Sequence, residues 1–315
     1  MDLSMTKKVA PLVQEVRSMI LEKIIPVEAE FFEELSNSKD RFAYTFRMTE
    51  ILENLKSEAK SKGLWNFWLT DSEKGYGLTT VEYAYLAEEM GKSRLAAEVF
   101  NCSAPDTGNM EVFERYGTIE HKTKWLDPLL KGKIRSAYCM TEPQVASSDA
   151  TNMSLRAVRK GSSYILNGEK WWASGSGDPR CAVYIVMVKT GGDELPKHKR
   201  HSMVVVPSNA DGIKIVRPMH VYGHDDAPHG HMQISFEDVV VPETDLLLGE
   251  GKGFEIAQGR LGPGRIHHCM RAIGQAESAL ELMCRRGLSR TAFNSLLVNL
   301  GANFDIIAES RIDIE

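Results

Sequence analysis

Seven short strand-like runs crowd into one continuous stretch of the chain, and this clustering constrains the fold more than any other feature of the sequence. All lie between residues 134 and 242: IRSAYCM, SLRAVRK, SYILNGEKWW, AVYIVMVK, HSMVVVP, GIKIVRP and MQISFEDVVVP. Gly, Pro, Asn and Asp separate them, as expected for β-strands. The sequence on both sides has apolar residues at helical spacing. We therefore expect an α+β chain with a central β-domain of sandwich or small-barrel type.

Capping residues and prolines mark the predicted helix ends in the first third of the chain. A first helix is predicted to end or kink at Pro26. A second is predicted from an N-cap at Thr49 to a stop at Gly63, and a third from Thr79 or Thr80 onward.

Two further local predictions concern the sheet and the C-terminal part. KGSSY and NGEK are typical of hairpin turns. From Lys252 the pattern returns to one long helical segment, which the sequence Gly-Pro-Gly at 262–264 interrupts. The sequence after Arg290 is helical in character as well.

Composition excludes several classes of protein. The net charge of −5, from 38 Lys+Arg against 43 Asp+Glu, argues against a nucleic-acid-binding protein. The five cysteines are widely spaced without a C-x-x-C pair, so we expect reduced, buried thiols in an intracellular protein. The longest apolar run is far below the ~20 residues of a membrane span. The N-terminus resembles neither a signal nor a transit peptide, which favours the cytoplasm slightly over the mitochondrion or peroxisome.

Three conspicuous segments have plain structural interpretations. GEGKG at 249–253 lacks the last glycine of a dinucleotide-binding loop and the Lys-Ser/Thr of a P-loop, so it predicts a strand-to-helix turn. HVYGHDDAPHGH at 220–231 matches no standard spacing of metal ligands, and its glycines and proline favour a solvated loop. The charged run GGDELPKHKRH at 191–201 is also expected to be a solvated loop.

Hydroxyl and indole side chains gather in two other segments, YCMTEPQVASSDATN at 138–152 and GEKWWASGSG at 168–177. A protein that uses a flavin supplies an aromatic or apolar face, hydrogen bonds to the pyrimidine edge and a donor near N5. Such groups are present if two strands bring the segments together: Thr141, Ser148, Trp172 and Ser174. By spacing alone, clusters of Ser and Thr are more often part of turns.

The order of these motifs resembles the acyl-CoA dehydrogenase flavoprotein family over essentially the whole chain. The resemblance rests on YCMTEPQVASSDATN, NGEKWWASG, FEDVVVPETDLLLGEGKGF and RTAF, after a helical domain. NCSAPDTGNMEVFERYG and GRLGPGRIHH further resemble the branch that in animals is often fused to a phosphotransferase-like domain. The resemblance to this family implies a helical N-terminal domain (1–134), a central β-domain (135–248) and the start of an incomplete C-terminal helical bundle (249–315).

The resemblance implies FAD-dependent α,β-dehydrogenation of an acyl-CoA thioester, with hydride transfer to flavin N5. Met140 and Thr141 would face the pyrimidine edge of the flavin, and Tyr138 belongs to the same cofactor-binding segment. Trp172 would pack beside the isoalloxazine, and Ser174, where the family often has Thr, would donate toward N5.

Outside the flavin ring, the resemblance implies contacts to the diphosphate and the substrate. Ser148 would lie near the diphosphate or the acyl-CoA, and Arg265 beside the thioester pocket. Arg290 would reach the FAD diphosphate of a neighbouring subunit, so a homo-oligomer is expected once the bundle is complete. Electron-transfer flavoprotein or a similar protein would accept the electrons.

Departures from the family pattern leave the catalytic base unassigned. Phe293, Asn294 and Ser295 stand where the family has Phe-Gly-Lys, and Gly264 occupies a slot that holds the base in some relatives. The usual carboxylate comes from a region later than Glu315. The sequence therefore leaves open an active dehydrogenase, and a truncated, inactive member that binds FAD and acyl-CoA or assembles with full-length partners. A helical protein without cofactor is a third alternative, which the Thr141, Trp172 and Ser174 set disfavours.

Overall fold

The computed structural model describes residues 3–70 and 74–315, which divide into two compact units. The first unit comprises the described residues up to 29 together with 55–100 and 265–315, and the second comprises 30–54 and 101–264. In the described residues, no helix has the length and apolar character needed to cross a membrane. The chain is a mixed α+β protein, as the alternation of sequence patterns predicts.

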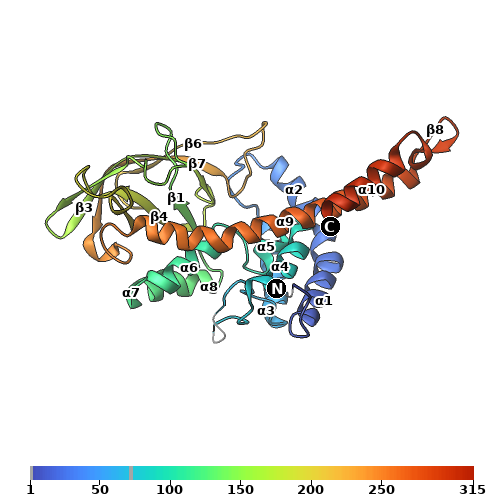
Figure 1. Ribbon diagram of the computed structural model, residues 1–315, viewed down its shortest axis with the longest axis horizontal. Helices are drawn as coiled ribbons and strands as arrows, with labels where there is room; N and C mark the ends of the chain where they lie inside the picture. The colour runs from blue at the N-terminus through green and yellow to red at the C-terminus, as the bar shows by residue number, and fades with distance from the viewer. Residues whose placement is uncertain (1–2, 71–73) are drawn as a thin grey trace. The chain divides into compact units, whose positions relative to one another are not determined.

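Helices build the first unit (Figure 1). Some of them extend into the second unit, and their bounds are α1 (Ala10–Met19), a π turn (Ile20–Ile24), α2 (Ile25–Asn37), α3 (Phe46–Ser61), α4 (Thr80–Gly91), α5 (Ala96–Val99), α9 (Gly253–Ser289) and α10 (Asn303–Ile314). Helix α10 runs back along the C-terminal part of α9, where Arg311 Nη1 donates to Glu277 Oε2 over 2.9 Å.

Capping chemistry predicts the start of α4 and the end of α3, but not the start of α3. Thr79 Oγ1 accepts from the backbone N–H of Glu82 in a complete capping box, and Gly63 follows α3 with φ of +72°. The prediction of Thr49 as an N-cap is wrong. Helix α3 begins at Phe46, and Thr45 Oγ1 accepts from the N–H of Met48 over 3.1 Å.

Neither predicted proline break ends a helix. Helical structure continues through Pro26, which has no N–H to donate. The π turn Ile20–Ile24 lies directly before α2 and changes the pattern of backbone hydrogen bonds there, so the helix accommodates the proline. Helix α9 likewise runs through Pro263 from Gly253 to Ser289. Pro263 cannot donate a backbone hydrogen bond, and α9 tolerates this single missing bond because regular helix continues on both sides of the proline.

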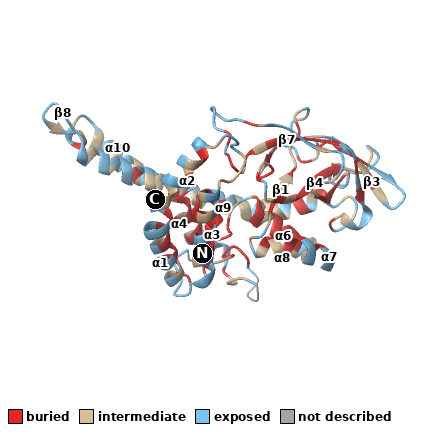
Figure 2. Ribbon diagram, turned by 180° about the vertical axis from the view of Figure 1, so that it is seen from behind, coloured by how far each residue is buried: buried red, intermediate tan, exposed pale blue. Residues whose placement is uncertain are grey.

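The segment after Arg290 is helical as predicted only over α10, because it begins with a hairpin. Strands β8 (Thr291–Ala292) and β9 (Ser295–Leu296) pair antiparallel. Phe293 and Asn294 both have left-handed φ, of 51° and 58°, which is the backbone of a two-residue I′ turn. Figure 2 shows this hairpin and α10 largely exposed, and α10 has no buried residue.

The second unit contains short helices and the sheet. The helical pieces are α6 (Asp106–Tyr116), α7 (Ile119–His121), a π turn (Lys122–Leu126), α8 (Asp127–Leu130) and two 3₁₀ turns (Lys197–Lys199 and Glu243–Asp245). All seven predicted strands form: β1 (Arg135–Cys139), β2 (Arg156–Lys160), β3 (Ser163–Ser174), β4 (Cys181–Lys189), β5 (His201–Pro207), β6 (Ile213–Pro218) and β7 (His231–Pro242).

The sheet curls around one core. Its order is β1-β4-β2-β3-β7-β6, with β5 paired to β4, and a single residue pair, Arg156 with Lys189, joins β2 to β4. The two halves on either side of this weak junction share one apolar cluster, to which Val186 and Val204 contribute from one half and Leu166 and Ile234 from the other. This arrangement confirms the predicted sandwich-like or barrel-like β-domain.

One of the two predicted hairpin turns forms. KGSSY connects β2 to β3, with Lys160 opposite Ser163. NGEK instead lies inside β3, where the register shifts between Leu166 and Gly168. Gly168 adopts φ of +143°, and Asn167 Nδ2 donates to Asp238 Oδ1 over 2.9 Å across the bulge. The Asn-Gly pair therefore makes a bulge in a long strand rather than its end.

Two glycines allow the backbones of α4 and α9 to touch inside the first unit, and substituting one of them tests this close packing. A Cβ on Gly274 would overlap the carbonyl oxygen of Glu88, and one on Gly91 would overlap that of Arg271. We expect Gly274→Ala to lower the free energy of unfolding by roughly 1–3 kcal/mol or more, because two backbones must separate. Urea unfolding followed by circular dichroism measures the change.

Gly264→Ala is the matched control in the same helix. Outside its chain neighbours and the nearby backbone of its own helix, no atom lies within 4 Å of a Cβ built on Gly264, so the substitution is expected to leave stability unchanged or raise it by up to about 1 kcal/mol. Equal loss of stability in both variants would contradict the close approach of α4 and α9.

Candidate functional site

The two hydroxyl-rich and tryptophan-rich segments meet side by side in the second unit. Thr141 Oγ1 donates to the carbonyl of Trp171 over 2.6 Å, and the N–H of Trp171 donates to the carbonyl of Thr141 over 3.0 Å. This reciprocal pair joins the segment after β1 to the end of β3. The condition on which the flavin hypothesis depends, that both segments lie together, is met.

A buried ion pair that the sequence analysis missed fixes this junction. Lys170 Nζ lies 2.7 Å from Glu142 Oε1, and the two side chains are 0% and 1% exposed. Lys170 Nζ also donates to the carbonyl of Met140 over 2.8 Å. Glu142 Oε2 accepts from the N–H and the hydroxyl of Ser154, and Oε1 accepts from the N–H of Leu155.

Electrostatics keep this carboxylate ionised. Burial alone would raise the pKa of Glu142, but the charge and hydrogen bond of Lys170, with the donors around it, outweigh burial and lower that pKa. The signal in the sequence is the position of Lys170, which falls in the same alternating row of the strand as the core residues Tyr164 and Leu166.

Trp172 has an unusual backbone that changes the expected direction of its indole. Its φ is +52°, and the β3–β7 register shifts between Lys170 and Ala173. Strict alternation would send Trp171 and Trp172 to opposite faces of the sheet. At this bulge it does not hold, and the two ring centroids lie 6.3 Å apart with planes tilted by 58°. Both indoles are partly exposed.

Ser174 belongs to a chain of three polar side chains. Its Oγ shares a hydrogen bond of 2.9 Å with His231 Nδ1, and His231 Nε2 lies 3.2 Å from Asp226 Oδ2. Ser174 and His231 are register partners in β3 and β7, so the sheet itself sets their separation. The ring centroids of His231 and Trp172 lie 6.2 Å apart.

The histidine-rich stretch is only partly the solvated loop that its composition predicts, because residues 220–224 are exposed but Asp225, Ala227 and Pro228 are buried. Asp225 forms a bidentate pair with Arg41, whose hydrogen bonds hold the pKa of Asp225 well below its usual range. His229 Nδ1 lies 3.0 Å from Asp178 Oδ2, and Asp178 also pairs with Arg180. Carboxylates thus tie the loop to the rest of the unit. Among the described residues, no cluster of His, Cys, Asp or Glu could hold a metal ion.

The remaining predicted residues have mixed surroundings. The Tyr138 hydroxyl donates to Met203 Sδ over 3.7 Å, and the Arg260 guanidinium carbon lies 3.8 Å from the ring centroid. Burial raises the pKa of Tyr138 to about 12, so it stays protonated. Ser148 is exposed in the segment after β1. Arg265 and Arg290 are exposed and belong to the first unit.

The five cysteines form no disulfide, but the expectation that all are buried is only partly correct. Cys102, Cys139 and Cys181 are buried, whereas Cys269 is exposed and Cys284 is partly exposed. Burial raises the pKa of Cys139 to about 12, so this thiol is unreactive at neutral pH.

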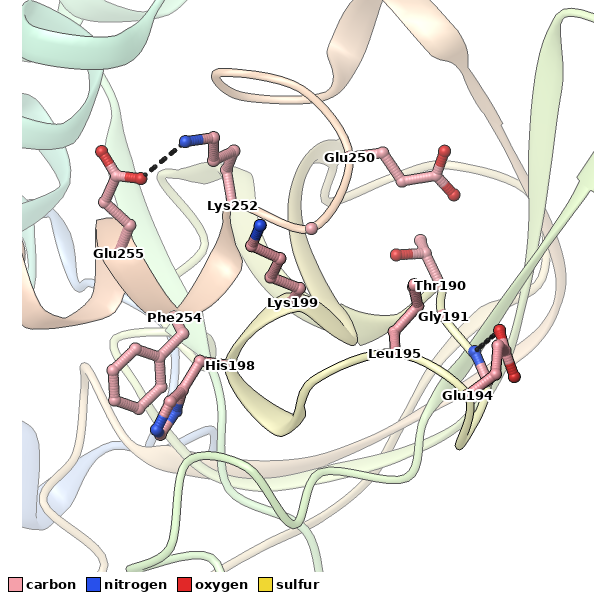
Figure 3. Close-up of a pocket in the computed structure, with 12 residues that line it drawn as sticks. Thr190, Gly191, Glu194, Leu195, His198, Lys199, Glu250, Lys252, Phe254 and Glu255 are labelled. Carbon is pink, nitrogen blue, oxygen red and sulfur yellow. Dashed lines mark hydrogen bonds and ion pairs between the residues drawn. The ribbon is translucent and has the colours of Figure 1, made fainter.

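A pocket of about 670 Å³ lies between the β4–β5 loop and the turn before α9 (Figure 3). These are the segments for which the sequence analysis predicts a solvated loop, at 191–201, and a strand-to-helix turn, at 249–253. His198 stacks near Phe254 with ring centroids 4.2 Å apart, and Lys252 pairs with Glu255 over 2.9 Å. Basic and acidic side chains line it together, so its charge does not mark it as a phosphate site.

Comparison with known proteins decides the family. Models of the acyl-CoA dehydrogenase N-terminal, middle and C-terminal domains match residues 6–133, 137–239 and 251–315. A solved structure from Mycobacterium abscessus described as an acyl-CoA dehydrogenase is 50% identical, with a TM-score of 0.93, and the match covers 99% of this chain and 77% of that one. The chain belongs to the acyl-CoA dehydrogenase family.

Two other relatives define the scope of this assignment. Acyl-CoA dehydrogenase family member 11 of Gallus gallus is 48% identical over 98% of this chain, which spans 40% of that relative's length. A glutaryl-CoA dehydrogenase from Mycobacterium smegmatis, solved in complex with FADH2, is 20% identical with a TM-score of 0.77, over 98% of this chain and 73% of that one. The second likeness shows the acyl-CoA dehydrogenase fold alone. FAD-dependent dehydrogenation is the general reaction of the family.

Removing the charge of Lys170 tests whether the buried pair fixes this part of the acyl-CoA dehydrogenase fold. We expect Lys170→Met to lower the free energy of unfolding by about 3–5 kcal/mol, because Glu142 is left buried without its counter-ion. A second substitution, Glu142→Gln, is expected to recover part of that loss because no charge then remains buried. Denaturant unfolding of the three proteins measures these differences.

Lys252→Met is the matched control, since the Lys252–Glu255 pair has side chains 49% and 56% exposed. Loss of this exposed ion pair is expected to lower the free energy of unfolding by less than about 1 kcal/mol. A Lys170→Met variant as stable as this control would show that the buried pair does not hold the two segments.

Proposed function

We propose that this chain provides the flavin site of an FAD-dependent acyl-CoA dehydrogenase, which oxidises the α,β-bond of an acyl-CoA thioester. One observation carries the proposal: the reciprocal hydrogen bonds between Thr141 and Trp171 hold the hydroxyl-rich and tryptophan-rich segments together. Membership in the family supports the same reaction. FADH2 in the Mycobacterium smegmatis relative supports the choice of cofactor.

The groups present at this junction fit a flavin. Trp172 supplies a flat, partly exposed indole, and the hydroxyl groups come from Thr141 and Ser174, which are partly exposed residues. The backbone N–H of Thr141 has no hydrogen-bond partner among the described residues, so a donor remains for an acceptor on the pyrimidine edge. Flavin recognition needs this combination of an apolar face and a few directed polar groups.

Bound FAD supplies the hydride acceptor, N5 of its isoalloxazine. In our proposal Met140 and Thr141 contact the pyrimidine edge near Tyr138, and Trp172 covers the ring. Ser174 contacts N5. The carbonyl of Met140 already accepts from Lys170, which leaves one of its two lone pairs for the cofactor.

The substrate and partner contacts are part of the same proposal. Ser148 lies near the diphosphate or the acyl-CoA, Arg265 beside the thioester, and Arg290 reaches the FAD of a neighbouring subunit in a homo-oligomer. Electron-transfer flavoprotein or a similar protein takes up the electrons. The α-proton requires a carboxylate base, and we assign none to this chain.

Flavin binding is the first test. We expect the purified chain to bind FAD with a yellow flavin spectrum, and Trp172→Ala to weaken binding by about 1–3 kcal/mol, the value of a stacked aromatic ring. Trp172→Phe is expected to retain much of the affinity because it keeps a flat ring. Titration of FAD followed by flavin fluorescence measures each dissociation constant.

Trp65→Ala is the control, because Trp65 is also a partly exposed indole but lies in the first unit. Its affinity for FAD is expected to match that of the unchanged chain. Absence of flavin binding, or equal loss in the Trp172 and Trp65 variants, refutes the proposed site. Reduction of an acceptor dye by acyl-CoA then separates a dehydrogenase from a member that binds FAD without turnover.

A further inference from the structure

The hydroxyl that we place at flavin N5 already has a partner on the protein side. Ser174 Oγ lies 2.9 Å from His231 Nδ1, within hydrogen-bond distance. A hydroxyl has one hydrogen to donate and two lone pairs that accept. If the hydrogen points to His231, only a lone pair of Ser174 is left for the flavin, so Ser174 would accept at N5 rather than donate to it as the family resemblance implies. The tautomer of His231 therefore decides what Ser174 offers to N5.

Asp226 determines that tautomer. Its Oδ2 lies 3.2 Å from His231 Nε2, and an ionised carboxylate accepts hydrogen bonds but donates none. The hydrogen of a neutral His231 is then on Nε2, and Nδ1 has a lone pair. Which ring nitrogen of a histidine is protonated depends on the partner of the other, so Ser174 must donate to Nδ1.

The backbone builds this arrangement into the second unit. Ser174 and His231 are opposite each other in the β3–β7 ladder. Asp226 has a left-handed φ of 52°, and its carbonyl accepts from the N–H of Gly230 over 2.9 Å. The adjacent Asp225 forms the bidentate pair with Arg41. The carboxylate that faces His231 therefore comes from an anchored loop.

We infer that His231 and Asp226 are positioning residues that turn the Ser174 hydroxyl into a hydrogen-bond acceptor toward flavin N5. This inference rests on the proposed flavin site. Reduced flavin has a hydrogen on N5 and oxidised flavin has a lone pair there. An accepting Ser174 favours the reduced form, so the Ser174–His231–Asp226 chain raises the reduction potential of the flavin.

The main experiment is a double-mutant cycle on the flavin reduction potential of the FAD-loaded chain, with Ser174→Ala, His231→Phe and the double variant. We expect His231→Phe to shift the equilibrium toward oxidised flavin by several-fold, up to about tenfold, or ~30 mV for a two-electron couple. In the Ser174→Ala background, His231→Phe is expected to change nothing, because His231 acts through the hydroxyl.

Two controls separate positioning from general damage to the site. His224→Phe changes an exposed histidine of the same loop and is expected to leave the potential unchanged. Asp226→Asn keeps the shape of the side chain and is expected to shift the potential in the same direction as His231→Phe, by a smaller amount. A His231→Phe shift of equal size with and without the Ser174 hydroxyl would overturn the inference.

A measurement without flavin tests the tautomer itself. Imidazole ¹⁵N chemical shifts of the cofactor-free chain, recorded above the ordinary histidine pKa of about 6.5, distinguish the two neutral tautomers of His231 and the charged ring. We expect hydrogen on Nε2 alone, and a mixture in Asp226→Asn. Hydrogen on Nδ1 in the unchanged chain overturns the inference while leaving the flavin site intact. A chain that binds no flavin overturns the proposed function and with it the role of His231.

Discussion

The buried contact between Lys170 and Glu142 determines how the polar segments of the second unit lie. Removing two charges from water is expensive, and their attraction offsets this only where further hydrogen bonds satisfy both groups. Here both oxygens of Glu142 have donors, from Lys170, Ser154 and the N–H of Leu155. A hydrophobic pair of the same volume could be as stable, but it would not direct a lysine to the carbonyl of Met140. The pair therefore fixes the position of the segment after β1 relative to β3.

Repeating patterns were predictable from the sequence, whereas single left-handed residues were not. All seven strands follow from short β-type runs between turn residues, although their burial differs: β5 is buried along nearly its whole length, whereas β6 has no buried residue. The failures occur where one or two residues leave that regularity. Asn167 and Gly168 have the composition of a turn, yet cross-strand bonds to Asp238 make them a bulge. Phe293 and Asn294 sit in an apolar, helix-like sequence, but both adopt left-handed φ and reverse the chain.

The candidate site also combines residues that could be predicted from the sequence with residues that could not. Thr141, Trp172 and Ser174 could be selected from the sequence because their chemistry suits a flavin, and the structure brings their segments together. The residues that arrange them were missed, because spacing alone does not show which side chains meet. Asp226 and His231 belong to the same histidine-rich segment, but only the structure shows that they pair with each other and that His231 faces Ser174. Lys170 was the detectable exception, a charged residue in the core-facing row of an alternating strand.

Two left-handed residues flank the Ser174–His231 hydrogen bond, and this placement bears on function. Trp172 and Asp226 both have φ of 52°. Bulky side chains such as that of Trp172 rarely adopt this conformation, which then costs on the order of 1–3 kcal/mol, whereas aspartate tolerates it better. Such strain persists only where surrounding contacts enforce it. At Trp172 the enforcing contacts are the β3–β7 ladder and the bond from Trp171 to Thr141; at Asp226 they are the Arg41–Asp225 pair and the bond from Gly230. In a regular strand Trp172 and Ser174, which are two residues apart, would point to the same face of the sheet. The bulge removes that constraint, so the directions of Trp172 and Ser174 depend on specific contacts with the rest of the second unit.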